Sequence, residues 1–486
     1  MQYISDIIDK QEIETNWKIG SKILLTSQTG KGKSHFIKTV LLEYCKENKL
    51  RILLLSNRKA LKNQNEEELR GEEDYITLMN YQALESNLIQ SEDDLEYLLR
   101  KFNVIVLDEV HYIFSDSEFS RSSDLLLETL HKNYPDKLMV FITATPEILL
   151  EYNPTFDKTY STKRDYSYIN KISFFGRDKT PEEIIQNLPV EEKVIYFSSD
   201  AQEAYELSQK FDDASFVCAD NNQMSRYSNQ NTLDEIAEKS YFSNRILCCT
   251  KVLDSGINII DKNVTTIIID SLDILNLVQA LGRKRITDKN EKINLYIKNY
   301  HSGNVNYNLM IINSKLATVE ELETYGKEEF QKAHKKISFH DVIDNDFTIN
   351  KAKLIFYKYK KEYLEKIKKT RDGYKTEVLR YFNIKDESAV GNADNEFEKI
   401  GIRAYLEKLK NIKLYKDEQE SFKVKFFSLL FSPKNTNYRN RGLRSITAIL
   451  EEDSIPYRLT SGKDNKGVTR DKRWWMVIDV ASYDNE

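Results

Sequence analysis

From Lys22 to about Tyr300, short apolar runs alternate with amphipathic segments. The apolar runs are rich in Ile, Leu, Val and Phe, and they read KILLTS, RILLLS, VIVLDEVH and KLMVFITAT, followed by KVIYFSS, ASFVCAD, RILCCT and TTIIID. Short β-rich runs that alternate with helical periods predict parallel strands with helices on both faces of the sheet. The pattern therefore predicts an α/β protein.

The strands divide into two groups at a polar segment. From Tyr152 to Tyr166 the chain reads YNPTFDKTYSTKRDY, where Pro and a run of Thr, Ser and Tyr interrupt the alternation. After His301 the strand signal fades, and a Lys-, Glu- and Tyr-rich sequence with helical spacing follows. We expect a first domain over 1–160, a second over 161–300, a connector over 301–345 and a C-terminal region over 346–486.

Composition narrows the class of protein. The 486 residues include 40% hydrophobic residues, enough for substantial cores, and the net charge of -5 argues against a globally basic nucleic-acid coat. The four cysteines have no metal-ligand spacing, and charged residues interrupt every apolar run well before eighteen residues. We expect a cytoplasmic protein with reduced cysteines and no membrane partner.

The segment Ser27 to Ser34 differs from the phosphate-binding pattern G-x-x-x-x-G-K-[ST] only at its first position. A predicted strand precedes it and a predicted helix follows it, so backbone N–H groups can converge on phosphate oxygens at a helix N-terminus. Lys33 is expected to neutralise the β and γ phosphates, and the Ser34 hydroxyl to bind magnesium. The predicted nucleotide-binding residues are Thr29, Gly30, Lys31, Gly32, Lys33 and Ser34. The alternative is a Gly- and Lys-rich surface turn.

A nucleoside triphosphate site needs a carboxylate near the phosphate loop, at the end of a neighbouring strand. The run VIVLDEVH supplies Asp108 as a magnesium ligand and Glu109 as a general base for the attacking water, with His111 near both. The alternative interpretation is a strand end with solvated acids.

The order of these segments resembles superfamily 2 helicases, the DEAD/DEAH box family, and the DExH type most closely. TGKGKS, DEVH and TATP are similar to motifs I, II and III, SNRKALKNQ to motif Ia, and TLMNYQAL to motif Ib. VIYFSS, CTKVLDSGIN and QALGRKR are similar to motifs IV, V and VI, and the resemblance covers about residues 20 to 300. It implies two tandem RecA-like domains that close on ATP and Mg²⁺.

Motif VI implies catalytic residues from the second domain: Gln279 and the arginine finger Arg283. The family pattern has a second arginine three positions after the first, where this chain has Ile286, and Arg285 lies one residue early. On a helix, a shift of one residue turns a side chain by about 100°. Arg285 is therefore predicted as a second finger that depends on local geometry.

The resemblance also implies nucleic-acid contacts in the two predicted RecA-like domains. Arg58 of motif Ia, Thr77 of motif Ib and Thr250 of motif V are predicted to touch the backbone of the strand, and Gly256 to contact the nucleotide. Thr143 and Thr145 are expected to link the carboxylates to the cleft. Threonine is also intrinsically common in strands, so a purely structural role stays open for these threonines.

The segment from Lys351 to Arg380 is basic and aromatic. It has eleven Lys or Arg residues against four Asp or Glu residues, interleaved with tyrosines. Cations along a backbone and aromatic faces under bases are typical of single-strand binding. A solvated amphipathic helix with tyrosines on its buried face accounts for the same pattern equally well.

The last segment predicts a helix followed by two strands joined by a basic loop, a unit that resembles a winged helix. Adjacent Trp474 and Trp475 on a strand must point to opposite faces, so one can pack in a core and the other can stack on bases. The basic residues predicted to face phosphates are Arg439, Arg441, Arg444, Arg470, Lys472 and Arg473. Among them Arg444 and Arg473, together with Trp474, are the predicted nucleic-acid-binding residues.

The expected function is that of an ATP-dependent helicase or translocase of superfamily 2 that moves along nucleic acid, with DNA favoured over RNA. A nucleic-acid-activated ATPase switch without strand separation has the same motifs. A P-loop nucleotidase or kinase unrelated to nucleic acid is the third alternative, and a protein partner stays open.

Overall fold

The computed structural model describes most of the chain in two compact units. Unit 1 comprises Met1–Lys171 and Val190–Ala389, and unit 2 comprises Ile172–Pro189 and Val390–Glu486. The described residues are 2–56, 69, 71–90, 97–115, 117, 123–131, 134–152, 155–176, 180–219, 222–250, 258–288, 290–334, 337–338, 341–370, 372–384, 390–392, 402–403, 405–430, 442–452, 455–465 and 469–480. None of the helices within these ranges is both long and apolar enough to cross a membrane.

The first sheet of unit 1 is parallel, with the strand order β3-β2-β4-β5-β1-β6. Its strands are β1 (Lys22–Thr26), β2 (Ile52–Ser56), β3 (Ile76–Asn80), β4 (Val104–Leu107), β5 (Leu138–Thr143) and β6 (Lys158–Ser161). We call this sheet and the helices up to α9 lobe 1. The prediction of a parallel α/β domain is confirmed.

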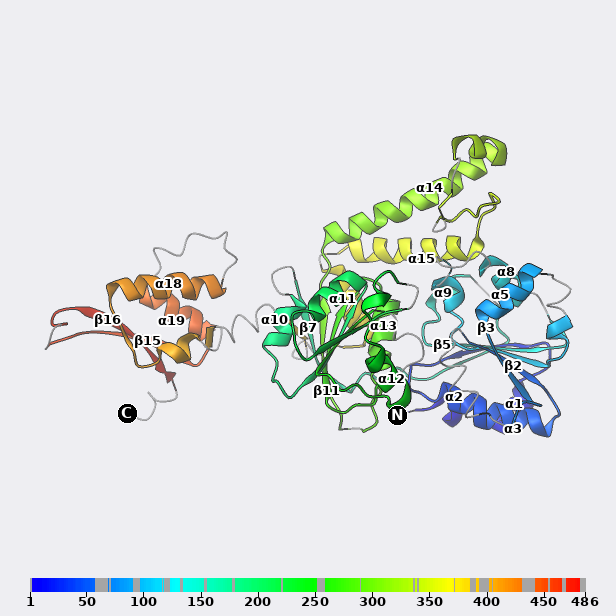
Figure 1. The fold of residues 1–486 in the computed structure, drawn as a ribbon, viewed down its shortest axis with the longest axis horizontal. Helices are drawn as coiled ribbons and strands as arrows, with labels where there is room; N and C mark the ends of the chain where they lie inside the picture. Colours follow the sequence, from blue (N-terminus) through cyan, green and yellow to red (C-terminus); the bar gives the residue numbers. More distant parts are fainter. Residues whose placement is uncertain are drawn as a thin grey trace. The chain divides into compact units, whose positions relative to one another are not determined.

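Helices cover both faces of the first sheet (Figure 1). They are α1 (Lys10–Asn16), α2 (Lys33–Phe36), which continues through a π-helical stretch (Ile37–Leu41) into α3 (Leu42–Glu47), α5 (Tyr81–Gln90), α7 (Tyr112–Ser115), α8 (Ser123–His131) and α9 (Glu147–Glu151). Successive strand residues point to opposite faces. Accordingly, Ile23 and Leu25 pack with Phe36 of α2, whereas Leu24 packs with Leu84 of α5.

Unit 1 also contains a second parallel sheet, in which the strands run in the order β12-β11-β8-β10-β9. These strands are β8 (Lys193–Ser198), β9 (Ala214–Val217), β10 (Ile246–Cys249), β11 (Val264–Asp270) and β12 (Ile293–Lys298). Their helices are α11 (Ala201–Ser208), α12 (Gln230–Lys239) and α13 (Ile274–Arg283). We call this group lobe 2. The two tandem parallel-sheet lobes match the predicted fold class.

After lobe 2 the chain of unit 1 becomes helical, as predicted. The helices are α14 (Ser302–Ala333), α15 (Lys351–Lys368) and α16 (Gly373–Tyr381). Helices α14 and α15 lie along each other (Figure 1). The domain boundaries expected from the sequence stay predictions.

In unit 2, two helices pack on an antiparallel sheet with the strand order β14-β16-β15. Its elements are α10 (Pro181–Gln186), β13 (Val390–Asn392), which pairs with β7 (Ile169–Phe175), β14 (Lys413–Leu414), α18 (Lys416–Leu430), α19 (Leu443–Glu452), β15 (Tyr457–Lys463) and β16 (Arg473–Asp479). Phe426 of α18, Ile446 of α19 and Val477 of β16 are buried in one core. The predicted helix-plus-hairpin unit is confirmed.

Candidate nucleotide site

The three motifs of lobe 1 meet at one edge of the first sheet. Strand β1 lies beside β5 with Thr26 opposite Thr143, and β4 lies on the other side of β5 with Leu107 opposite Phe141. The carboxyl ends of parallel strands share one edge, where ligands of open α/β sheets bind. The phosphate loop, DEVH and TATP therefore emerge side by side.

The phosphate loop has the backbone shape that its glycines permit. Gly30 and Gly32 have φ angles of 85° and 80°, in the left-handed region that favours glycine. Gly32 is also the N-cap of α2, so the loop leads directly into the helix N-terminus. The side chain of Ser34 in the first turn is exposed, whereas Lys33 is buried.

Ser27, which departs from the phosphate-loop pattern, is only 2% exposed. Its hydroxyl oxygen accepts a hydrogen bond from the Thr162 hydroxyl at 3.1 Å, and its backbone N–H donates to the Thr143 carbonyl at 2.9 Å. A buried hydroxyl is tolerated when it has a hydrogen-bond partner. Thr162 supplies that partner, from a position that the sequence patterns did not single out.

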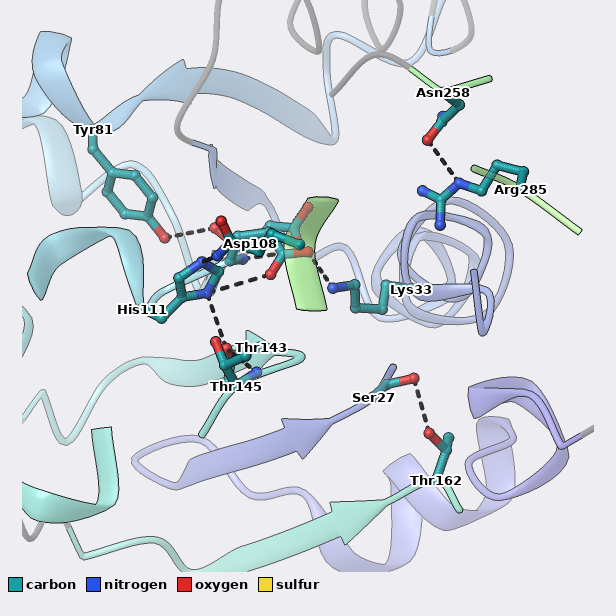
Figure 2. Close-up of polar contacts among 12 residues, drawn as sticks. Ser27, Lys33, Tyr81, Asp108, His111, Thr143, Thr145, Thr162, Asn258 and Arg285 are labelled. Carbon is teal, nitrogen blue, oxygen red and sulfur yellow. Dashed lines mark hydrogen bonds and ion pairs between the residues drawn. The ribbon is translucent and has the colours of Figure 1, made fainter. Parts of the chain in front are cut away.

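Lys33 points at the DEVH motif and forms an ion pair with Glu109 (Figure 2). The backbone N–H of Glu109 donates to the Asp108 carboxylate at 3.1 Å, and the Tyr81 hydroxyl donates to the Asp108 carbonyl at 3.0 Å. Glu109 has a φ of 50°, which is uncommon for a residue with a side chain. Strained backbone of this kind is often found at functional sites.

The two adjacent carboxylates have pKa values that are shifted in opposite directions. Burial, and then the neighbouring Glu109 charge, raise the pKa of Asp108 to about 6. Burial also opposes ionisation of Glu109, but the nearby Lys33 ammonium, through its charge and the hydrogen bond that it donates, outweighs burial and lowers the pKa of Glu109 to about 2. Glu109 is therefore ionised at neutral pH, as a general base must be.

His111 joins the two lobes through a chain of hydrogen bonds. The amide nitrogen of Gln279, on α13 of lobe 2, lies 2.5 Å from Nε2 of the buried His111 ring. Nδ1 lies 3.1 Å from the Thr143 hydroxyl, which accepts the Thr145 backbone N–H at 3.0 Å. With Nε2 accepting from Gln279, Nδ1 carries the proton and donates to Thr143.

Helix α13 lies directly against the phosphate loop. A Cβ placed on Gly282 would lie 2.8 Å from the Thr29 hydroxyl oxygen, and a Cβ on Gly30 would lie 3.3 Å from Nη1 of Arg285. A side chain at position 282 would clash with Thr29, whereas Gly30 is already favoured by its left-handed φ angle. The structure therefore brings together the phosphate loop, the carboxylates and motif VI.

Arg285 reaches the loop although it lies one residue before the family position. Helix α13 ends at Arg283, and Lys284 is already extended, with φ of -75° and ψ of 113°. Arg285 donates from its backbone to the Ile259 carbonyl and from Nε to Asn258 at 2.7 Å (Figure 2). In an extended segment alternate side chains share one side, so Arg285 faces the loop while Lys284 turns away to pair with Glu291. The helical rotation expected from the sequence does not apply, because the helix has ended.

Beside the phosphate loop, unit 1 has a cavity of about 290 Å³. Its walls include Tyr3, Lys31, Asp165, Tyr168 and Arg285. Lys31 is 2% exposed, and its Nζ has no hydrogen-bond partner among the residues that the structure describes, with Asp165 at 3.9 Å. Burial lowers the pKa of Lys31 and lowers that of Arg285 to about 10. Buried cations of this kind are compensated by an anionic ligand, and phosphate groups fit that requirement.

Sequence patterns missed part of this cavity. Tyr3, Asp165 and Tyr168 belong to no recognised motif, and they reach the loop only through tertiary contacts. The Gln28 side chain donates to the Asp165 carbonyl at 3.1 Å and accepts its N–H at 2.8 Å. The backbone N–H of Ile4 donates to the Lys31 carbonyl at 3.1 Å. In the sequence, only the position of Gln28 inside the phosphate loop indicated that a further segment could contact this loop.

The predicted nucleic-acid residues of unit 1 lie in different places. Thr77 is half-buried on β3, and Thr250 is buried just after β10. Arg58 and Gly256 lie outside the described residues, as do Arg439 and Arg441 of the last segment. The structure thus places Thr77 and Thr250 without bringing them into the cluster around Lys33.

In unit 2, Arg444 on α19 and Arg473 on β16 are exposed, as are Arg470 and Lys472. Trp475 packs partly on the unit 2 core. The indole of Trp474 donates to Asp464 at 3.1 Å, and a Cβ on Gly462 would lie only 2.3 Å from its ring. The two tryptophans therefore point to opposite faces, and Trp474 is fixed against the hairpin with one face covered.

Comparisons with known proteins give a family match and, for the fold, a distant likeness to one of many solved structures that match. Residues 70–148 match the family model described as "Type III restriction enzyme, res subunit", which covers DEVH and the TAT of the next strand. The likeness is to a single-substitution variant of S. cerevisiae Dbp5 bound to RNA and ADP BeF3, at 14% sequence identity, 58% coverage of this chain, 79% of that chain and a TM-score of 0.41. No curated protein matches the chain. The family match therefore relates part of lobe 1, including DEVH, to this family, and the structure brings that part together with the phosphate loop and with α13 of lobe 2.

Proposed function

We propose that the protein is a DExH-type ATP-driven helicase or translocase that moves along a nucleic-acid strand. The observation that carries this proposal is the contact of α13 with the phosphate loop, where Gln279 meets His111 and Arg285 lies over Gly30. An enzyme in which two lobes share one nucleotide can couple hydrolysis to movement between them.

The residues of lobe 1 fit a magnesium-bound triphosphate. Beside the left-handed Gly30 and Gly32, the buried Nζ of Lys31 has no hydrogen-bond partner among the residues that the structure describes, and its ion pair with Asp165 is long, at 3.9 Å. The loop from Thr29 to Ser34 would hold the phosphates, with Lys33 on the β and γ groups, and Ser34 and Asp108 would hold Mg²⁺. When bound, Mg²⁺ neutralises charge on the transferred phosphoryl group.

Glu109 is the proposed general base. In the ion pair with Lys33 its carboxylate is already ionised. Phosphate oxygens that draw the Lys33 ammonium away would leave this carboxylate able to accept a proton from the attacking water. Arg283 and Arg285 of lobe 2 would stabilise the charge that develops on the phosphoryl group.

The bond chain Gln279–His111–Thr143–Thr145 is the proposed link between the nucleotide and the two lobes. Every member is part of one hydrogen-bonded network, so separation of the lobes must break the bond at Gln279. In this proposal hydrolysis makes and breaks that bond, and the lobes shift along the strand as a result.

Nucleic acid is the proposed second substrate, with DNA as the first candidate because the matched family is named for a restriction enzyme. The proposed strand contacts are Arg58, Thr77 and Thr250 in unit 1, and Arg444, Arg473 and Trp474 in unit 2. The exposed arginines of unit 2 suit phosphates, and the half-buried ring of Trp474 is the proposed contact for a base. Gly256 remains a proposed nucleotide contact.

The test has two steps. ATP hydrolysis is measured with single- and double-stranded DNA and RNA, and strand displacement is then measured on tailed duplexes, beside Lys33→Ala in both assays. We expect stimulation by at least one polymer and displacement that requires Lys33. Stimulation without displacement on any tail would favour the alternative, a nucleic-acid-activated ATPase switch. Hydrolysis that no polymer stimulates would contradict both.

A further inference from the structure

The basic, aromatic segment from Lys351 to Arg380 forms helices α15 and α16, and these helices contact both lobes of unit 1. Its tyrosines turn inward: Tyr357 and Tyr374 are 2% and 1% exposed. Of the two interpretations of this segment, the structure therefore favours the amphipathic helix with tyrosines on its buried face.

The first half of α15 is fixed in lobe 1. Ala352 and Phe356 are buried in the same core as strands β1, β2, β4 and β5. Asn350 caps the helix by accepting the backbone N–H of Lys353 at 3.0 Å, and Ser123 of α8 donates to the same oxygen at 3.5 Å. Core packing of this kind ties the beginning of α15 rigidly to lobe 1.

The second half of α15 and the beginning of α16 are fixed in lobe 2, just before α13. The Tyr363 hydroxyl donates to the Leu272 carbonyl at 3.1 Å, and the Tyr374 hydroxyl donates to the Ser271 carbonyl at 2.6 Å. The next residue, Asp273, caps α13 by accepting the Leu275 N–H at 2.9 Å. Two hydroxyls therefore hold consecutive carbonyls immediately before the motif VI helix.

The surroundings of Tyr374 keep its hydroxyl in place. Its ring meets the ring of Tyr300 edge-on at 5.4 Å, and the Tyr300 hydroxyl donates to the carboxylate of Asp270, the last residue of β11. Burial raises the pKa values of Tyr363 and Tyr374 well above the ordinary tyrosine value. Both hydroxyls therefore stay protonated and act as donors throughout the neutral range.

The turn between α15 and α16 is built for this contact. A Cβ on Gly373 would lie 1.9 Å from the Ile367 carbonyl, so only glycine allows the two helices to approach so closely. At the far end of α16, the ring of Phe382 meets the ring of Tyr166 in the chain between the lobes at 4.6 Å. The helix pair is thus held at lobe 1, at lobe 2 and at the segment that joins them.

We infer that Tyr363 and Tyr374 are positioning residues for ATP hydrolysis, because they link the start of α13 to the core of lobe 1 through α15 in the arrangement in which Gln279 meets His111. This inference rests on the proposed function, in which α13 carries Gln279 and Arg283. A ten-residue helix behaves as a rigid rod about 15 Å long, so a displacement at its first turn displaces the arginine at its last turn. Small misplacements of catalytic groups have large kinetic effects.

The test compares Tyr363→Phe/Tyr374→Phe with the matched control Tyr357→Phe, whose lost hydroxyl accepts from Lys315 of α14 rather than donating to the segment before α13. The turnover number and the KM for ATP are measured at saturating nucleic acid, together with the unfolding temperature. We expect kcat to fall about fivefold to tenfold in the double variant, with KM within about twofold, since the phosphate loop is untouched. The control should match the unchanged protein.

A double variant with the kcat of Tyr357→Phe overturns the inference, and so does a rise in KM at constant kcat. If the double variant unfolds below the assay temperature, Tyr363→Phe alone carries the test, with a fall in kcat of about threefold. Unchanged protein that shows no hydrolysis stimulated by nucleic acid would instead contradict the proposed function. The two failures are therefore distinguishable.

Discussion

The two walls of the candidate nucleotide site are built in different ways. The lobe 1 wall is a loop and a helix N-terminus on one sheet edge, where Lys33 already pairs with Glu109. The lobe 2 wall is the end of α13 and the extended residues after it, which reach across to Gly30 and His111. In the proposed mechanism the first wall binds the phosphates, whereas hydrolysis needs both walls. Substitutions on the two walls should therefore separate binding from turnover.

Lys33→Ala should have the largest effect because it removes the cation of the first wall. We expect the affinity for ATP to fall about 100-fold and hydrolysis to reach the background rate. Binding of a fluorescent ATP analogue and phosphate release measure the two effects. Lys10→Ala, which removes an exposed lysine that pairs with Glu47, is the control. Unchanged binding in Lys33→Ala would remove the loop from the nucleotide site.

Glu109→Gln should separate binding from turnover within the first wall. The amide cannot accept the proton of the attacking water, so we expect kcat to fall about 10⁴-fold. The phosphate cradle is retained, and ATP affinity should stay within about threefold of its original value. Single-turnover hydrolysis beside equilibrium binding checks both. Normal turnover would exclude Glu109 as the base.

Arg283→Ala and Arg285→Ala test the second wall. We expect kcat to fall about 10³-fold for Arg283 and about tenfold for Arg285, with little change in ATP binding for either. We expect the smaller effect at Arg285 because it lies one residue before the position of the second arginine in the family pattern. Its hydrogen bond to Asn258 also fixes its guanidinium beside the loop. Equal losses would show that two fingers act together. A loss of binding would contradict the division between the walls.

Ser27→Gly should have the smallest effect, since it restores the family residue and leaves the buried Thr162 hydroxyl without its acceptor. We expect the protein to lose about 1 kcal/mol of unfolding free energy while kcat stays within about twofold. Thermal unfolding of Ser27→Gly, Thr162→Val and the double variant forms a double-mutant cycle. Additive losses would show that the Ser27–Thr162 bond contributes nothing.

Much of the lobe architecture could be predicted because it depends on local patterns. Apolar runs such as VIVL define strands through burial on both faces, and the loop after β1 is recognisable because its glycines are required by backbone geometry. The helix and hairpin of unit 2 follow from the same kind of pattern. These features can be predicted without knowing which distant residues they contact in the folded protein.

Other features could not be predicted because they depend on where distant segments meet. Tyr3 and Tyr168 line the cavity beside Lys31 only after folding. The side that Arg285 faces depends on where α13 ends, and the exact end of a helix is difficult to predict from a sequence. The inward direction of Tyr374 depends on its contact with Ser271.

The sequence by itself determined the α/β class, the phosphate loop and the order of the helicase motifs, because strand burial, glycine geometry and residue chemistry act over a few neighbouring positions. The tertiary structure alone decided which polar groups pair: Lys33 with Glu109, Gln279 with His111, and the α15 and α16 tyrosines with the segment before α13. Those pairings join residues far apart in the chain. Their geometry follows from the packing of whole sheets and helices, which no local pattern specifies.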